Sequence, residues 1–159
     1  MTLGLESLLV CKDSVHAFAR LTRGRGIMRP DLAAMDWVER VRAGYAAFNA
    51  GDGSVIADLT APDCVFRDYG AGQINTTVGA AELMAQSAQF AAIAAFTMEV
   101  VDVHPHLDVG LIVTIVRVEF GTGVVFHEAH LVRLVDDHVV EYQSIPFDVE
   151  ASKIPFASN

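Results

Sequence analysis

Apolar residues between positions 36 and 51 recur at helical spacing, between a polar start and a glycine. Asp36 is suited to cap a helix N-terminus, and Glu39 follows three residues later, where a capping box has its acid. The stripe ends at Gly51, a residue type that commonly terminates helices. It consists of Trp37, Val41, Gly44, Tyr45 and Phe48. The pattern predicts one amphipathic helix.

Shorter patterns fill the middle of the chain. Residues 54–59 predict a second short helix, and residues 60–63 predict a turn that leads into a strand at 64–66. Residues 70–78 have no periodicity and predict an irregular loop. Residues 79–95 are rich in Ala, Gln, Leu and Met, which predicts a third helix.

The second half of the chain is predicted to be a sheet. Four apolar, β-branched runs are separated by turn signals, and they cover residues 98–103, 111–120, 124–135 and 139–145. Helices followed by an antiparallel meander predict an α+β domain, with the helices packed on one face of a curved sheet.

Composition and charge narrow the classes of partner. The 159 residues carry a net charge of -9, which argues against nucleic acid or an anionic membrane. No apolar run approaches the ~20 residues that a membrane-spanning helix needs. Two cysteines, Cys11 and Cys64, are too few for a disulfide framework, so we expect a cytoplasmic protein.

The charge changes sign along the chain. Residues 1–29 have a balance of +3, whereas residues 30–159 have a balance of -12. We therefore expect residues 1–34 to be a basic N-terminal extension, either disordered or the result of a mis-assigned start, since Met28 and Met35 closely precede the domain. The domain is expected at 35–150, with a C-terminal tail at 151–159.

Two short segments carry a family resemblance. The segment Tyr45-Ala-Ala-Phe-Asn-Ala-Gly-Asp52, followed by Phe66-Arg-Asp-Tyr69, resembles the nuclear transport factor 2-like superfamily. That superfamily includes ketosteroid isomerases, SnoaL-like polyketide cyclases and limonene epoxide hydrolases. The resemblance implies a cone-shaped domain, with the N-terminal helices on the concave face of a curved antiparallel sheet. It also implies no cofactor or metal, and a homodimer formed through the outer face of the sheet. The apolar residues Leu131 and Val139 are expected to be exposed on that face.

Asp68 is the first candidate for chemistry. The number of residues between the segment Asn49 to Asp52 and Asp68 matches bacterial ketosteroid isomerase without a gap. The resemblance implies that Asp68 is the carboxylate that moves a proton between carbons. A carboxylate in an apolar pocket has its charged form destabilised, and the raised pKa lets it act as base and then as acid. That isomerase is a known example of carboxyl groups whose pKa values are set by their surroundings. The alternative is that Asp68 caps the turn that follows it.

The partners of Asp68 depart from the isomerase pattern. The donor tyrosine of that family would fall on Gly44, while this chain has Tyr45 one place later. Tyr45 is either a core residue or a secondary hydrogen-bond donor. The second acid of the family aligns with His130, and an imidazole can also donate to a developing oxyanion.

Strand alternation groups the neighbours of His130. Glu128 and His130 share one face of the predicted strand with Phe126, Val132 and Leu134. Such a face is either a cavity lining or a surface pair near the end of a strand. Asp68, Glu128 and His130 form the best candidate catalytic cluster.

Epoxide hydrolysis is a competing hypothesis. Arg117-Val118-Glu119 resembles the Arg-x-Asp pair of limonene epoxide hydrolases, but Ser144 and Asp68 replace two other polar residues of that family. The alternative is that Arg117 and Glu119 form an exposed cross-strand pair.

Metal binding has weak support. His104-Pro105-His106 is expected in a proline turn, and His127 points away from His130 on its strand.

The sequence therefore predicts a cofactor-independent acid–base enzyme, namely an isomerase, cyclase or dehydratase. Its substrate would be a hydrophobic small molecule such as a polyketide, terpenoid or steroid-like compound. The alternatives are an epoxide-opening enzyme, or a non-catalytic binding or dimerisation module with a closed or wholly apolar cavity. The catalytic residues are Asp68, His130 and Glu128, and the substrate contacts are Tyr45, Trp37, Phe66, Val132 and Tyr142.

Overall fold

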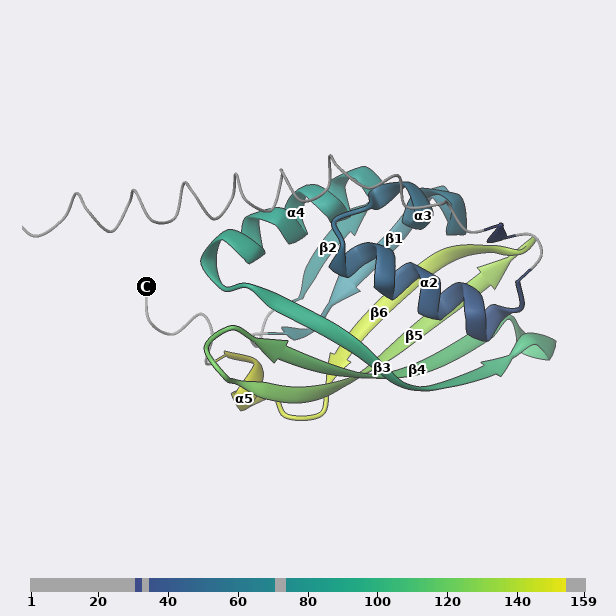
Figure 1. The fold of residues 1–159 in the computed structure, drawn as a ribbon. Helices are drawn as coiled ribbons and strands as arrows, with labels where there is room; N and C mark the ends of the chain where they lie inside the picture. Colours follow the sequence, from purple (N-terminus) through teal and green to yellow (C-terminus); the bar gives the residue numbers. More distant parts are fainter. Residues whose placement is uncertain (1–30, 33–34, 71–73, 154–159) are drawn as a thin grey trace, which may run out of the picture.

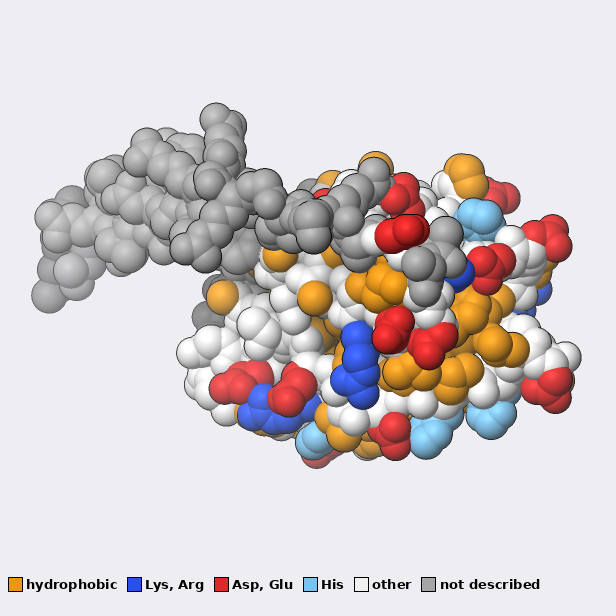
Figure 2. Space-filling model, turned by 45° about the vertical axis from the view of Figure 1, so that its right-hand side comes forward, with side chains coloured by type: hydrophobic (Ala, Val, Ile, Leu, Met, Phe, Trp, Pro, Cys, Tyr) orange, Lys and Arg blue, Asp and Glu red, His pale blue; other side chains and the backbone are white. Residues whose placement is uncertain are grey.

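The computed structural model describes residues 31–32, 35–70 and 74–153, and it places helices on one face of a curved six-stranded sheet (Figure 1). The predicted extension at 1–34 and tail at 151–159 lie largely outside these residues, and the predicted domain bounds stay a prediction. No helix in the described ranges is long and apolar enough to cross a membrane. Acidic side chains are dispersed over the face seen in Figure 2.

The first described helix, α2 (Trp37–Asn49), begins and ends where the sequence predicts. Asp36 Oδ1 accepts a hydrogen bond from the backbone N–H of Glu39 at 2.9 Å, which satisfies a donor that the first turn leaves free. After the helix, Gly51 has φ 72°, a left-handed conformation that costs a glycine little. The predicted stripe faces inward, because Val41 and Gly44 are buried.

The sheet has the order β2-β1-β6-β5-β4-β3. The antiparallel meander from β3 to β6 is confirmed, but β1 runs parallel to β6, so the sheet is mixed and not purely antiparallel. The strands are β1 (Thr60–Asp68), β2 (Asn75–Val78), β3 (Phe96–His106), β4 (Leu111–Phe120), β5 (Val125–Val135) and β6 (His138–Pro146). Helix α3 (Gly53–Leu59) precedes β1, α4 (Ala80–Ile93) follows β2, η3 (Leu107–Val109) follows β3, and α5 (Val149–Lys153) follows β6.

Three local predictions are wrong in detail. The expected turn at 60–63 is part of β1, whose pairing with β6 is irregular between Thr60 and Val65. That irregularity accommodates Pro62, which has no N–H to give to a regular ladder. The expected loop at 70–78 contains β2, and the expected proline turn at 104–106 is the end of β3.

A bulge in the last hairpin overturns another expectation. The pairing of β5 with β6 shifts between Arg133 and Leu134, which changes the alternation of the residues that follow. Val139 was expected on the outer face beside Leu131, but it is buried in the core. Leu131 is half-buried on β5, and a homodimer through the outer face stays a prediction.

Two side-chain contacts attach α2 to the sheet. The Trp37 indole and the Arg40 guanidinium both donate to the carboxylate of Asp137, at 3.1 and 2.6 Å, in the turn between β5 and β6. At the other end, the Asn49 amide donates to Met98 O at 2.7 Å and accepts from Met98 N at 3.0 Å. Asn49 thus bonds β3 through both backbone groups of one residue, as a neighbouring strand would.

We expect Asn49→Ala to lower the free energy of unfolding by about 1–3 kcal/mol, because it leaves the N–H and C=O of Met98 without these partners. Urea denaturation followed by circular dichroism measures the change. Arg42→Ala, an exposed position on the same helix, is the control and should stay within about 0.5 kcal/mol of wild type. Equal stability of the two variants would contradict the role of Asn49.

Candidate functional site

A cavity of about 450 Å³ lies between the helices and the concave face of the sheet. This volume is typical of sites for small organic ligands. All four α-helices and all six strands of the described chain contribute to its wall, which includes most of the aromatic residues of the protein. Every residue predicted from the sequence to be catalytic or substrate-binding lies on this wall, namely Trp37, Tyr45, Phe66, Asp68, Glu128, His130, Val132 and Tyr142.

Polar residues form a row across the floor of the cavity. Asp68 on β1 pairs with Ser144 on β6, Ser144 pairs with His130 on β5, and His130 pairs with Thr114 on β4. Residues that are direct partners in neighbouring strands project from the same face of a sheet. The register of four strands thus assembles residues that are up to 76 positions apart in sequence, between Asp68 and Ser144.

His130 is completely buried, and its Nε2 lies 2.7 Å from Glu128 Oε2. Ser144 Oγ donates to the same carboxylate oxygen at 2.8 Å. A carboxylate oxygen accepts hydrogen bonds, so the proton of this contact belongs to Nε2 of His130. The contact with Glu128 therefore selects the tautomer of the neutral His130 ring that carries its proton on Nε2. In this tautomer Nδ1 is a hydrogen-bond acceptor.

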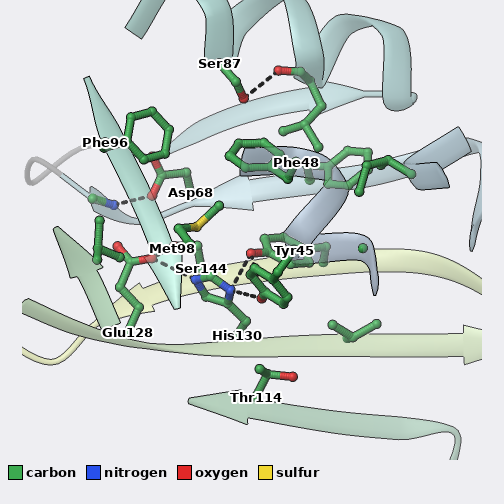
Figure 3. Close-up of a pocket in the computed structure, with 18 of the residues that line it drawn as sticks. Tyr45, Phe48, Asp68, Ser87, Phe96, Met98, Thr114, Glu128, His130 and Ser144 are labelled. Atoms are coloured by element: carbon green, nitrogen blue, oxygen red, sulfur yellow. Dashed lines mark hydrogen bonds and ion pairs between the residues drawn. The ribbon is translucent and has the colours of Figure 1, made fainter. Parts of the chain in front are cut away.

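Two tyrosine hydroxyls, those of Tyr45 and Tyr142, meet at Nδ1 of His130. Figure 3 shows Tyr45 beside the His130 ring. Burial raises the pKa of both phenols above the ordinary value, so both remain protonated at neutral pH. Nδ1 has a single lone pair and accepts one of the two protons. The two hydroxyl oxygens are 3.4 Å apart, so their mutual contact is long. One tyrosyl proton is consequently available to a ligand oxygen.

Asp68 combines the two roles that the sequence left open. Its Oδ1 accepts a hydrogen bond from the backbone N–H of Gly70 at 2.8 Å, as a turn cap does, and its side chain also lines the cavity. Burial raises the pKa of the Asp68 carboxyl, and the charge of Glu128 acts in the same direction, while the Gly70 N–H opposes both. The net result is that the pKa of the Asp68 carboxyl lies above its ordinary value.

Gly70 was not singled out from the sequence. It is buried beside Asp68, and a Cβ at this position would lie 2.9 Å from Asp68 Oδ1. A glycine therefore allows the backbone to approach the carboxylate closely. Ser144 was also not assigned to the cluster; its alternation with Tyr142 along β6 was the pattern that could have placed both on one face.

Arg117 and Glu119 lie on the opposite face of β4 from the cavity. The Arg117 Nη1 and Glu119 Oε2 atoms are 2.6 Å apart at the surface, whereas Val116, Val118 and Phe120 are buried. The hypothesis of an exposed pair is thus the one that fits, and the Arg-x-Glu basis for epoxide hydrolysis is removed.

The histidines outside the cavity do not gather around a metal site. No group of three or more His, Cys, Asp or Glu residues with metal-binding geometry occurs in the described part of the chain. His104 and His106 are exposed on β3, and His127 is exposed on the other face of β5 from His130. The buried Cys64 has its pKa raised to about 12, chiefly by burial, so it remains a thiol.

A family model described as the SnoaL-like domain matches residues 41–142. No curated protein matches the chain.

Solved structures share the fold at low identity. Bal32a, from a soil-derived mobile gene cassette, is 22% identical, has a TM-score of 0.64, and the match covers 72% of this chain and 91% of that chain. TerC, co-crystallised with polyporic acid, is 18% identical with a TM-score of 0.62, over 76% and 98% of the two chains. An epoxide hydrolase of M. tuberculosis similar to limonene epoxide hydrolases is 14% identical with a TM-score of 0.58, over 74% and 86%. At these identities the likeness concerns the fold alone.

The raised pKa of Asp68 predicts a pH-dependent effect of Asp68→Asn on stability. A carboxyl whose pKa is higher in the folded than in the unfolded protein binds its proton more tightly when folded. Its stabilising contribution is present below the ordinary value of 3.8 and is lost as the pH rises through the folded pKa. The unfolding free energy of Asp68→Asn should therefore rise relative to that of wild type as the pH increases from 4 toward neutrality. Urea titrations across this range measure the difference, and a difference independent of pH would contradict the prediction.

Proposed function

Since the chain belongs to the family of SnoaL-like domains, we propose that it is a cofactor-independent acid–base enzyme that isomerises, cyclises or dehydrates a hydrophobic small molecule. One observation carries the proposal. A carboxyl group with a raised pKa and a tyrosyl proton without a committed acceptor share one largely apolar cavity. This combination is what proton transfer next to a carbonyl group requires.

In the proposed reaction, Asp68 removes a proton from a carbon atom beside a substrate carbonyl. The electrons of the C–H bond form a C=C bond, and the carbonyl π electrons move to oxygen, which becomes an enolate. Tyr45 or Tyr142 donates a hydrogen bond to that oxygen, while His130 holds the other tyrosine and Glu128 holds His130. In an isomerisation, Asp68 then returns its proton to another carbon. In a cyclisation, the enolate carbon instead attacks a second carbonyl carbon, whose oxygen becomes an alkoxide and takes up the proton that Asp68 holds.

The lining also constrains the charge of the substrate. The cavity contains the side chains of Asp68, Glu128 and His130, while the lining residues in the described part of the chain include no Lys or Arg. A carboxylate or phosphate on the substrate would face like charge without a cation to pair it. We infer an uncharged carbonyl compound with a flat or ring-rich skeleton, such as a polyketide, terpenoid or steroid-like molecule, held between aromatic side chains.

Two rival functions remain distinguishable. A non-catalytic binding or dimerisation module would have a closed or wholly apolar cavity, whereas polar groups from four strands and α2 enter this one, which supports an enzyme. An epoxide-opening enzyme would need an acid to protonate the epoxide oxygen. Asp68 or a tyrosine could supply it, so epoxides belong in the same substrate panel.

The first activity prediction concerns the proposed base. In a screen of enone, polyketide and epoxide substrates, Asp68→Asn should lower kcat by roughly 10²–10⁴-fold for the compound that wild type converts, because an amide cannot take up the proton. Asp63→Asn is the matched control, since Asp63 is exposed on the same strand and lies outside the cavity. Absence of turnover for every substrate, or an unchanged rate for Asp68→Asn, would show that the acid–base proposal is wrong.

The second activity prediction concerns the oxyanion donor. At least one of Tyr45→Phe and Tyr142→Phe should lower kcat by roughly 10²–10³-fold with a small change in KM, because the lost hydrogen bond strengthens in the transition state. Tyr69→Phe removes the third tyrosine hydroxyl of the chain, which does not line the cavity, and should keep the wild-type rate. Wild-type kcat in both cavity variants would rule out a tyrosine as the donor.

A further inference from the structure

Thr114 carries a buried, unpaired hydroxyl in the wall of the cavity. It lies in the middle of β4, is completely buried, and lines the cavity beside His130, its direct partner on β5 (Figure 3). Among the described residues, Thr114 Oγ1 is the one buried side-chain polar atom without a hydrogen-bond partner. The polar side chains grouped around His130, namely Tyr45, Tyr142, Glu128 and Ser144, make no hydrogen bond to it.

The surroundings of Thr114 make this hydroxyl costly. Ile112 and Val116, which precede and follow it on the same face of β4, are also completely buried. A valine has nearly the shape of threonine and would pack there without a polar atom. A buried hydroxyl without a partner destabilises the protein, so packing alone does not account for a threonine at this position.

We propose that Thr114 is a specificity-determining residue whose hydroxyl binds a second oxygen of the substrate, apart from the oxygen that meets the tyrosines. A threonine hydroxyl donates and accepts, so the substrate group is a hydroxyl or a carbonyl. The substrate is therefore a compound with at least two oxygen functions on its ring skeleton. This inference rests on the proposed function only in that a ligand occupies the cavity; it does not require turnover.

The reason for selectivity is the cost of an unmet hydrogen bond. A site with a buried hydroxyl favours a ligand that pairs with it over an analogue of the same shape that lacks the second oxygen. In Thr114→Val the preference for the ligand with the second oxygen should disappear, since the methyl group that replaces the hydroxyl needs no hydrogen-bond partner. Thr114→Ser keeps the hydroxyl and should retain the preference.

The binding test uses calorimetric titration of the full-length protein with 2-naphthol and with the 1,5-, 2,6- and 2,7-dihydroxynaphthalenes, which place the second oxygen at different positions. We expect at least one diol to bind wild type and Thr114→Ser roughly threefold to tenfold more tightly than 2-naphthol does. Thr114→Val should bind that diol and 2-naphthol equally. Thr97→Val, at an exposed threonine on β3, is the control and should behave as wild type does.

The stability test uses the free protein. Thr114→Val should raise Tm by about 2–4 °C, because it removes an unsatisfied buried hydroxyl, while Thr97→Val should leave Tm within about 1 °C. A lower Tm for Thr114→Val would show that the hydroxyl already has a partner, and would overturn the proposal. So would an unchanged diol preference in Thr114→Val, or a failure of all four probes to bind wild type. If only the proposed acid–base function is wrong, the probes should bind with the expected selectivity, but no substrate should be turned over.

Discussion

The buried imidazole of His130 is the interaction on which the site depends. Its Nε2 is bonded to Glu128 on the same strand, and its Nδ1 meets Tyr45 from helix α2 and Tyr142 from β6. One buried ring therefore connects the helical layer to two central strands in the protein interior, where a polar group without a partner is costly. Because Glu128 decides which ring nitrogen carries the proton, it also decides that the tyrosines meet an acceptor.

This arrangement places a cavity where a domain of this size would otherwise have packed side chains. A cavity removes contacts between the helices and the sheet, so α2 needs other attachments. These attachments lie at its two ends. Trp37 and Arg40 donate hydrogen bonds to Asp137 at one end, and Asn49 is hydrogen-bonded to the backbone of Met98 at the other. The middle of the helix is left to face the cavity, with Gly44 and Tyr45 on its wall. The position of Tyr45 thus follows from contacts distant from it.

Much of the local structure could be predicted from the sequence, because it depends on neighbouring residues. The cap at Asp36 and the helix that follows it are confirmed. Alternation along β5 placed Glu128 and His130 on one face, and the structure buries both. Errors arose where a distant strand decided the outcome. Residues 75–78 form a strand because they pair with the edge of β1. Val139 is buried because a bulge shifts the register of the last hairpin.

By itself, the sequence determined the elements, the faces they bury and the family resemblance, since period and capping are properties of the local backbone. It also nominated Asp68, Glu128 and His130 as a set. Only the tertiary structure decided that Asp68, Ser144, His130 and Thr114 form one row, because that row depends on the register of strands far apart in the chain. The packing of α2 and β6 against β5 brought two tyrosines to His130 and left Thr114 without a partner, and no local pattern encodes the distances between such groups.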